Sequence, residues 1–397
     1  MAGMFSKKLQ RSVVGRKTVF DELKQKITTQ DRVIWFHCAS LGEYEQGVPV
    51  MVDLRKKFSE HKLLVTFFSP SGYDIKKDSP LADVIIYMPL DTRNNARFFL
   101  ELAHPEIAVF VKYEFWPNFL IELGVLNIPT IYISATFRRD QIFFKWYGRF
   151  MQPVLKNVKH FFVQDAASKE VLSDLGYVNT TCSGDTRFDR VSYQIEMDNT
   201  LGFVADFVQD RLCIVCGSTW PEDDAILMEY INGVSSSVCF VIAPHEIKPN
   251  GVTALQKKLN ISSVLFSEKE GEKLSDYQVL IIDAIGYLTK IYSYADIAYV
   301  GGGMGTAGLH NILEAATFGV PIVIGENFDR FLEAKQLQKL AGLFSVSTEA
   351  ELKQIMTLLE TDKKFREQTG MIAGHFINRN TGATPTVVAY IKGILNN

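Results

Sequence analysis

The sequence predicts an α/β protein with two doubly wound, Rossmann-like domains that face each other across a central cleft. The chain has 397 residues, and a prior of about 150 residues per domain suggests two domains. In both halves, short runs of β-branched and aromatic residues alternate with segments of helical character, as in a parallel sheet covered by helices on both faces. Such sheets bind ligands at the carboxyl ends of their strands.

The expected strands fall into two series. The first comprises 33–36, 63–67, 84–87, 107–111, 130–134 and 160–163, and the second comprises 212–215, 239–242, 264–266, 279–282, 298–300 and 320–324. Residues 177–201 are polar and lack this pattern, so we interpret them as an inter-domain linker. We therefore expect an N-terminal domain at 1–195, a C-terminal domain at 205–375, and a last helix at 376–397 that crosses back to the first domain.

The bulk composition excludes several classes of protein. A net charge of −3 argues against nucleic acid as the main partner, because the chain has no global positive field. The five cysteines lie in apolar segments and are odd in number, which favours reduced thiols. Cys213 and Cys216 have C-x-x-C spacing, but no second Cys/His pair completes a zinc site. The sequence contains no apolar run long enough for a transmembrane helix.

A glycine cluster follows the expected strand 298–300 and is the clearest sign of a ligand. It comprises Gly301, Gly302, Gly303, Gly305 and Gly308. Glycines let backbone N–H groups approach a ligand closely, and a helix N-terminus after them favours anions. We therefore predict a phosphate site.

Two alternatives to a phosphate site remain. The cluster also matches G-x-G-x-x-G, the dinucleotide fingerprint, and it can equally be a structural turn. Dinucleotide fingerprints open the first βαβ unit of a domain, whereas this cluster follows a late strand, so its position argues against NAD. No Walker A sequence occurs.

A helix is expected over 309–317, directly after the glycines. His310 and Glu314 are four positions apart and are expected on one face, with Asn311 beside them. Glu314 is placed to accept hydrogen bonds from ribose hydroxyls. A solvated helix start is the alternative explanation.

Charged residues also follow two strands of the first domain. Ser40, Gly42 and Glu43 come directly after the first strand, and Lys112 and Glu114 follow the strand 107–111. A carboxylate at such a strand end can serve as a general base. Helix capping is the alternative in both places.

Three further features complete the list of candidate residues. Arg187 lies at the expected domain junction, where its guanidinium can bind carboxylate or phosphate. His245 ends the strand 239–242. Cations alternate with aromatic residues over 137–150, including Arg138, Arg139 and Lys145. We interpret this stretch as a surface for an acylated, anionic acceptor at a membrane or as an amphipathic helix packed on its own sheet.

Several separated motifs together resemble the 3-deoxy-D-manno-octulosonic acid (Kdo) transferases of lipopolysaccharide assembly. The resemblance extends over residues 31–390. Four motifs of the family occur here in the same order. They are S-x-G-E at Ser40–Glu43, E-x-W-P-N at Glu114–Asn118, G-x-x-K/R-F-D at Gly184–Asp189 and N-x-L-E at Asn311–Glu314. Lys112 stands where many members carry Glu, Arg187 replaces a common Lys, and His245 lacks the usual Arg-His-Pro run.

The resemblance implies a GT-B glycosyltransferase fold and a role for each group of residues. Glu43 is implied to be the catalytic base, with Lys112, Glu114 and Arg187 as further catalytic residues. Ser40, Gly42, Arg138, Arg139 and Lys145 are assigned to the acceptor and membrane face. The residues implied to bind CMP are Pro244, His245, Ile285, Gly286, Tyr287, Gly302, Gly303, Asn311, Ile312, Leu313 and Glu314.

The implied reaction is inverting transfer of Kdo from CMP-Kdo to a lipid A precursor, without a metal ion or other cofactor. Most members begin with an apolar anchoring helix, which residues 1–16 do not contain. We therefore expect peripheral contact with the cytoplasmic face of the inner membrane, or an anchor outside this chain. The alternatives are a UDP-sugar transferase or epimerase of the same fold and a non-enzymatic nucleotide-binding protein.

Overall fold

The computed structural model describes residues 10–11, 13–141 and 144–396. The chain divides into two compact units, which are described separately. One unit ends at Arg190 and resumes at Asn380, and the other comprises Val191–Arg379. The expected boundary at 195–205 therefore lies a few residues too far along the chain, and the return to the first unit begins at 380 rather than 376.

The N-terminal unit is built on a seven-stranded sheet in the order β3-β2-β1-β4-β5-β6-β7, with every pair parallel. The strands are β1 (Arg32–Cys38), β2 (His61–Phe67), β3 (Val84–Tyr87), β4 (Ile107–Val111), β5 (Thr130–Ala135), β6 (His160–Val163) and β7 (Thr180–Cys182). The helices are α2 (Val19–Lys26), α3 (Leu41–Lys57), α4 (Pro70–Lys76), α5 (Arg93–Ala103), α6 (Pro117–Val125), the 3₁₀ helix η2 (Trp146–Asn157), α7 (Ala166–Asp174), α8 (Thr186–Tyr193) and α17 (Ala383–Leu395).

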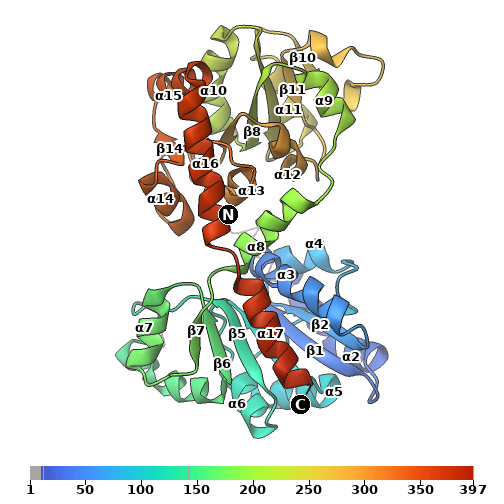
Figure 1. Ribbon diagram of the computed structural model, residues 1–397. Coiled ribbons are helices and arrows are strands. Elements are labelled where there is room, and N and C mark those ends of the chain that lie inside the picture. Colours follow the sequence, from blue (N-terminus) through green and yellow to red (C-terminus); the bar gives the residue numbers. More distant parts are fainter. Residues whose placement is uncertain (1–9, 12, 142–143, 397) are drawn as a thin grey trace. The chain divides into compact units, whose positions relative to one another are not determined.

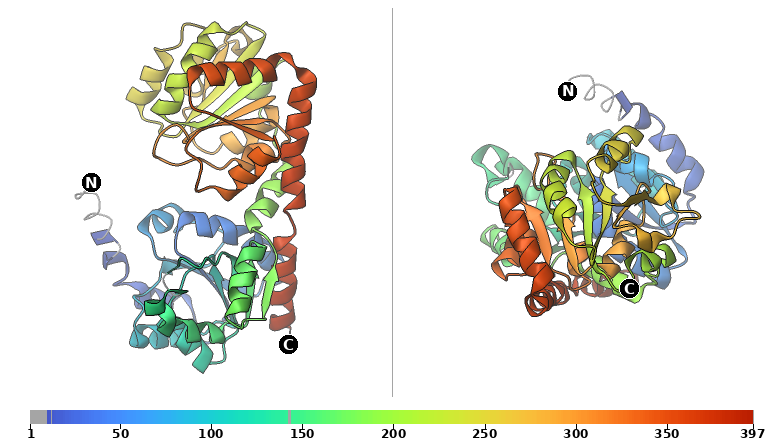
Figure 2. Two further views of the ribbon diagram at one scale, coloured as in Figure 1. Left: turned by 90° about the vertical axis from the view of Figure 1, so that its left-hand side faces the viewer. Right: turned by 90° about the horizontal axis from the view of Figure 1, so that it is seen from above.

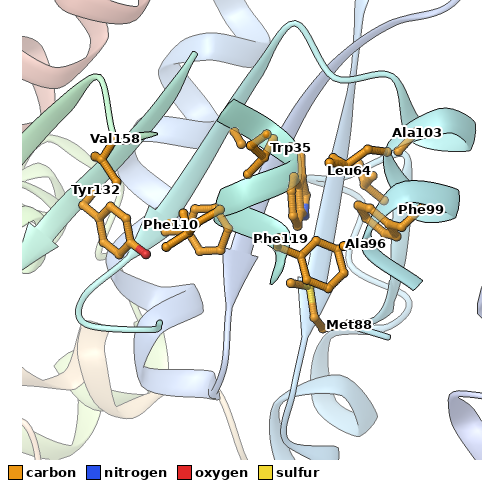
Figure 3. Close-up of a cluster of buried hydrophobic side chains, with 14 of the residues drawn as sticks. Trp35, Leu64, Met88, Ala96, Phe99, Ala103, Phe110, Phe119, Tyr132 and Val158 are labelled. Atoms are coloured by element: carbon orange, nitrogen blue, oxygen red, sulfur yellow. The ribbon is translucent and has the colours of Figure 1, made fainter. Parts of the chain in front are cut away.

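Helices cover both faces of this sheet, which explains why its central strands are apolar on both sides (Figures 1 and 2). On one face, Trp35 of β1 packs against Phe99 of α5 and Phe119 of α6, with ring centroids 4.8 and 5.8 Å away (Figure 3). On the other face, Val387 and Ile391 of α17 lie in the same buried cluster as residues of α3. The C-terminal helix is therefore part of the N-terminal core.

The C-terminal unit repeats this architecture with the order β10-β11-β9-β8-β12-β13-β14, again with every pair parallel. The strands are β8 (Leu212–Thr219), β9 (Val238–Pro244), β10 (Ser263–Leu265), β11 (Val279–Ile281), β12 (Ile297–Val300), β13 (Ile322–Gly325) and β14 (Leu343–Val346). The helices are α9 (Gly202–Val208), α10 (Pro221–Gly233), α11 (Pro249–Gln256), α12 (Leu288–Ile291), α13 (Leu313–Ala316), α14 (Leu332–Lys339), α15 (Glu349–Thr361) and α16 (Lys363–Arg379).

The strand order reverses once in each unit. In the N-terminal sheet β1 and β4 are neighbours, and the chain winds outward from them in opposite directions. In the C-terminal sheet β8 and β12 have the same relation. Loops that follow such a pair of strands diverge and leave a crevice at the carboxyl ends, which is where open α/β sheets bind ligands.

The structure corrects three details of the sequence analysis. Residues 177–201 are not a plain linker, because they contain β7 and α8. The short strand β14 was not predicted. The helix expected over 309–317 is reduced to α13, a single turn, so the glycine cluster is followed by a loop and not by a helix N-terminus.

Within the described residues, none of the helices has the length and hydropathy needed to cross a bilayer.

Asp189, the last residue of the G-x-x-R-F-D motif, fixes the start of α17. Its Oδ1 accepts a hydrogen bond from the Gly382 N–H at 2.6 Å, and its Oδ2 accepts one from the Thr384 N–H at 2.9 Å. The first N–H groups of a helix have no partner within the helix, so this carboxylate satisfies two of them. Its negative charge also interacts favourably with the positive end of the helix dipole.

We predict that Asp189→Ala lowers the free energy of unfolding by about 1 kcal/mol, the usual cost of losing a helix cap. Urea denaturation followed by circular dichroism measures this change. Asp78→Ala, at an exposed position in the same unit, is the matched control and should change stability little. Equal stability of the two variants would contradict the capping role.

Candidate active site

Glu43 lies in the first turn of α3, just after the carboxyl end of β1. Its side chain is only 6% exposed, and its Oε2 accepts a hydrogen bond from the Ser40 N–H at 2.9 Å. Burial raises the pKa of Glu43, while Lys112 and the hydrogen bonds from Ser40 and Ala39 partly offset this rise. Glu43 therefore caps α3 and is also a carboxylate with increased basicity.

Lys112 and Glu114 follow β4, the strand paired with β1 at the reversal of strand order. Lys112 has φ of 71°, in the left-handed region, and its Nζ lies 5.3 Å from the centre of the Tyr113 ring. The backbone carbonyl of Glu114 accepts a hydrogen bond from the Tyr132 hydroxyl at 2.7 Å, which holds the turn against β5. The two loops at this point thus bring one cation and two carboxyls together.

The two carboxyls influence each other's ionisation. Burial and the charge of Glu43 raise the pKa of Glu114 to about 7, against the opposite effect of Lys112. Like charges in a shared low-dielectric site resist joint ionisation. The pKa values of both carboxyls are therefore raised, and Glu114, with a pKa of about 7, is partly protonated near neutral pH.

The residues assigned to an acceptor and membrane face do not form one cluster. Ser40 and Gly42 adjoin Glu43 at the start of α3, and the Arg138 guanidinium lies 6.0 Å from the Tyr113 ring centre, beside the same site. Arg138 also forms an ion pair with Asp140 at 3.4 Å. Arg139 forms an ion pair with Asp174 of α7, and Lys145 is an exposed residue before η2. Residues 142–143 and the side chains of Tyr147, Arg149 and Phe150 lie outside the described part of the chain.

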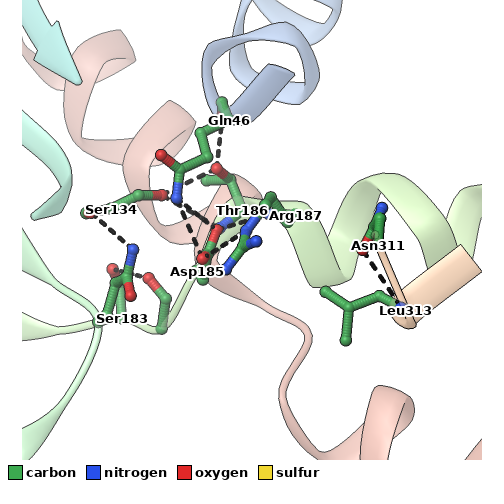
Figure 4. Close-up of polar contacts among 10 residues, drawn as sticks. Gln46, Ser134, Ser183, Asp185, Thr186, Arg187, Asn311 and Leu313 are labelled. Atoms are coloured by element: carbon green, nitrogen blue, oxygen red, sulfur yellow. Dashed lines mark hydrogen bonds and ion pairs between the residues drawn. The ribbon is translucent and has the colours of Figure 1, made fainter. Parts of the chain in front are cut away.

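Arg187 belongs to a polar network between α8 and α3 (Figure 4). Its Nε donates to Asp185 at 2.9 Å, and the same buried carboxylate accepts from the Gln46 Nε2 of α3 at 3.1 Å. The Thr186 hydroxyl donates to the Gln46 carbonyl at 2.5 Å. Gln46 follows Glu43 by one turn of α3, so the network fixes the helix that carries Glu43. Sequence reasoning found Arg187 but missed Asp185 and Gln46.

The glycine cluster forms a tightly packed loop after β12. Gly302 has φ of 91°, and a Cβ there would meet the Gly308 carbonyl oxygen at 2.2 Å. A Cβ on Gly303 would meet the Gly325 nitrogen at 2.9 Å. In the described chain, no protein group accepts a hydrogen bond from the N–H groups of residues 303–309. A run of successive unbonded N–H groups is suited to an anion.

Asp223, in the first turn of α10, anchors this loop and was missed by sequence reasoning. It is fully buried, and it accepts hydrogen bonds from the Tyr299 hydroxyl at 2.9 Å and from the Gly302 N–H at 2.8 Å. A third bond comes from the Trp220 N–H at 2.9 Å. One carboxylate therefore joins the loop after β8 to the strand β12 and the loop that follows it.

Three rings stack beside the glycine loop. The His245 ring lies 4.4 Å from the Trp220 ring centre and 4.6 Å from that of His310. The Trp220 Nε1–H donates to His310 Nε2 at 3.0 Å, and burial lowers the pKa of His310 to about 4. His310 is therefore a neutral acceptor at physiological pH. Its expected place on a common helix face with Glu314 is wrong, because His310 precedes the single turn of α13.

Glu314 and its neighbours form the second side of the same region. Glu314 accepts from the Thr289 hydroxyl at 2.9 Å and from the Asn311 Nδ2 at 3.1 Å, and Asn311 Oδ1 accepts from the Leu313 N–H at 3.2 Å. Thr289 belongs to α12, so these bonds place the preceding residues 285–287 near Glu314.

The remaining predicted CMP residues differ in exposure. Ile285 is 90% exposed, and Gly286 has φ of 98° with open space where a Cβ would be. Tyr287 packs its ring against Phe203 and Phe266, while Ile312 and Leu313 are buried. Pro244 is the last residue of β9. The C-terminal candidates therefore lie at the carboxyl ends of strands of one sheet or in the segments that follow these strands.

Among the described residues, no group of three or more His, Cys, Asp or Glu side chains has the arrangement of a metal site.

We predict that Asp223→Asn destabilises the protein by about 2 kcal/mol, because an amide supplies only one acceptor oxygen and leaves at least one buried donor unpaired. The free energy of unfolding in urea measures the effect. Asp210→Asn, at an exposed position of the same unit, is the control. A loss no larger than that of the control would show that Asp223 does not hold the glycine loop.

Comparison with known proteins supports the fold and identifies relatives. A bifunctional glycosyltransferase/methyltransferase from Fusobacterium nucleatum is 26% identical over 391 residues, covering 95% of this chain. The chain spans only 59% of that protein's length. The 3-deoxy-D-manno-octulosonic acid transferase of Haemophilus influenzae is 25% identical over 380 residues, covering 91% of this chain and 87% of its own.

A solved UDP-GlcNAc 2-epimerase from Neisseria meningitidis superimposes with a TM-score of 0.64 at 17% identity, covering 93% of this chain and all of that one. This likeness confirms the GT-B fold. Residues 14–190 match the family described as 3-deoxy-D-manno-octulosonic-acid transferase (kdotransferase). The N-terminal unit of this chain therefore resembles the Kdo transferases over residues 14–190.

Proposed function

We propose that this protein transfers Kdo from CMP-Kdo to a lipid A precursor, with inversion at the anomeric carbon. The observation that carries the proposal is the group formed by Glu43, Lys112 and Glu114 at the reversal of strand order in the N-terminal sheet. A buried carboxyl and a half-buried one beside a lysine supply a general base whose basicity suits a sugar hydroxyl. The names of the relatives supply the transferred sugar, Kdo. The donor CMP-Kdo and the lipid A precursor as acceptor are taken from the resemblance of the sequence motifs.

In the proposed step, the Glu43 carboxylate accepts the proton of the attacking acceptor hydroxyl. The hydroxyl oxygen forms a bond to the anomeric carbon of Kdo, and the bond from that carbon to the CMP phosphate oxygen breaks. CMP leaves with the bonding electron pair. Glu114, with a pKa of about 7, is partly protonated near neutral pH and so lowers the local negative charge, while Lys112 favours the ionised form of Glu43.

The C-terminal unit has the groups needed to hold CMP. The unbonded N–H groups of residues 303–309 suit the phosphate, and Glu314 suits ribose hydroxyls. The exposed loop at Ile285 and Gly286 lies near Glu314 and is suited to the base. Arg187, although bound to Asp185, adds positive charge in the N-terminal unit. Lysine, arginine and backbone N–H groups supply the positive charge of this mechanism, so the proposal requires no metal ion.

The proposed acceptor also implies a location. A lipid A precursor is acylated and resides in a membrane, so we propose peripheral contact with the cytoplasmic face of the inner membrane. Arg138, beside Tyr113 and the catalytic group, is the cation that this proposal assigns to the acceptor's phosphates. The described positions of Arg139 and Lys145 give these residues no comparable role.

We predict that Glu43→Gln lowers kcat for Kdo transfer by about 10²–10⁴-fold, the usual contribution of a general base. Glutamine keeps an acceptor for the Ser40 N–H, so the fold and CMP affinity should remain. The measurement is steady-state transfer together with CMP titration. Glu60→Gln, at an exposed position, is the matched control.

Two outcomes would contradict this proposal. Undiminished turnover of Glu43→Gln would remove Glu43 as the base. Thermal stabilisation of the wild-type protein by UDP but not by CMP would favour a UDP-sugar enzyme instead, because a ligand stabilises only the state that binds it.

We predict that Lys112→Met moves the acid limb of the pH profile of kcat/KM to higher pH. Lys112 lowers the pKa of both Glu43 and Glu114, so its loss raises both values and the base is ionised only at higher pH. Methionine is uncharged and keeps most of the length of the side chain. Lys77→Met, on the exposed end of α4, should leave the profile unchanged. An acid limb that stays in place or moves to lower pH would refute this coupling.

A further inference from the structure

A small cavity adjoins the glycine loop at the ends of two neighbouring strands. It has a volume of about 270 Å³ and is lined by Gly305, Thr306 and Gly308 after β12 and by Asp329, Arg330 and Phe331 after β13. Because β12 and β13 are parallel neighbours, their following loops lie at the same edge of the sheet. Ligand sites usually have about 300–1,000 Å³, so this cavity accommodates one end of a nucleotide sugar and not the whole molecule.

The walls of the cavity are closely fixed. The Asn327 N–H donates to the Gly303 carbonyl at 2.8 Å, and the Asn327 Nδ2 donates to the Met304 carbonyl at 3.1 Å. These bonds hold the loop after β13 against the glycine loop. The position of Arg330 is thus tied to the segment whose N–H groups suit the donor's phosphate.

The charged side chains that line the cavity are Asp329 and Arg330. Asp329 forms an ion pair of 2.6 Å with Lys335 of α14, which lowers the pKa of Asp329. Asp329 is therefore ionised, and the positive charge of Lys335 balances its negative charge. Arg330 is exposed. Its guanidinium is a planar fork that can bind a carboxylate through two parallel hydrogen bonds.

We infer that Arg330 binds the carboxylate of the sugar acid that is joined to CMP, and that the cavity selects sugar acids over neutral sugars. This inference rests on the proposed function, in which the donor's sugar carries one carboxylate. The N–H groups of residues 303–309 suit the phosphate, and Arg330, which lines the same cavity from the loop after β13, suits the donor's second anionic group.

The first test separates the carboxylate from the phosphate. In Arg330→Gln, kcat/KM for CMP-Kdo should fall at least tenfold, while the Kd for CMP stays within twofold of the wild-type value. Arg330→Lys should be intermediate, because a lysine keeps the charge but loses the fork. The exposed Lys353→Gln of α15 is the control. Unchanged kcat/KM in Arg330→Gln would overturn the inference, and so would an equal loss of CMP affinity, which would assign Arg330 to the phosphate.

A second test uses the neighbouring ion pair. Lys335→Gln leaves Asp329 unpaired beside Arg330 and should lower kcat/KM for CMP-Kdo, and adding Asp329→Asn should restore it. Failure of this restoration would contradict the role of local charge. Absence of both CMP binding and Kdo transfer in the wild-type protein would instead refute the proposed function, so the two failures are distinguishable.

Discussion

The reversal of strand order in each parallel sheet determines where the proposed base and the glycine loop lie. At β1 and β4 the chain leaves two neighbouring strands in opposite directions, and the loops after them carry Glu43, Lys112 and Glu114. At β8 and β12 the same divergence exposes the glycine loop and the side chains next to it. The remaining structure keeps these loop positions fixed by burying the strands between two layers of helices.

Glu43 and Asp223 occupy equivalent places in the two units, but their contacts suit them to different roles. Glu43 and Asp223 both occupy the first turn of the helix after the first strand of a sheet. Both carboxylate oxygens of Asp223 accept hydrogen bonds, three in all, and these bonds hold the glycine loop in place. Glu43 accepts hydrogen bonds from Ser40 and Ala39 at the start of α3, but its burial raises its pKa and it lies beside Lys112 and Glu114, so it is suited to accept a proton.

The sequence predicts most of the sheet because buried parallel strands are continuous apolar runs, and it identifies the glycine cluster and Glu43 by their place after such runs. The short edge strands β7 and β14 have partly exposed residues and give a weaker signal. Asp223 cannot be recognised from sequence, since an acid in a first helical turn is ordinary and only its contacts with Tyr299 and Gly302 distinguish it. His310 was misplaced because the segment after the glycines has helical composition, whereas its contacts with Trp220 and His245 hold it in a loop.

The central claim is that the chain moves Kdo from CMP-Kdo to a lipid A precursor. The most direct measurement is the mass of a tetraacylated lipid A precursor after incubation with the purified protein and CMP-Kdo. The account predicts a product whose mass has increased by one or more Kdo residues, with release of CMP in equal number. A precursor whose mass stays unchanged in the presence of intact CMP-Kdo and folded protein would contradict it.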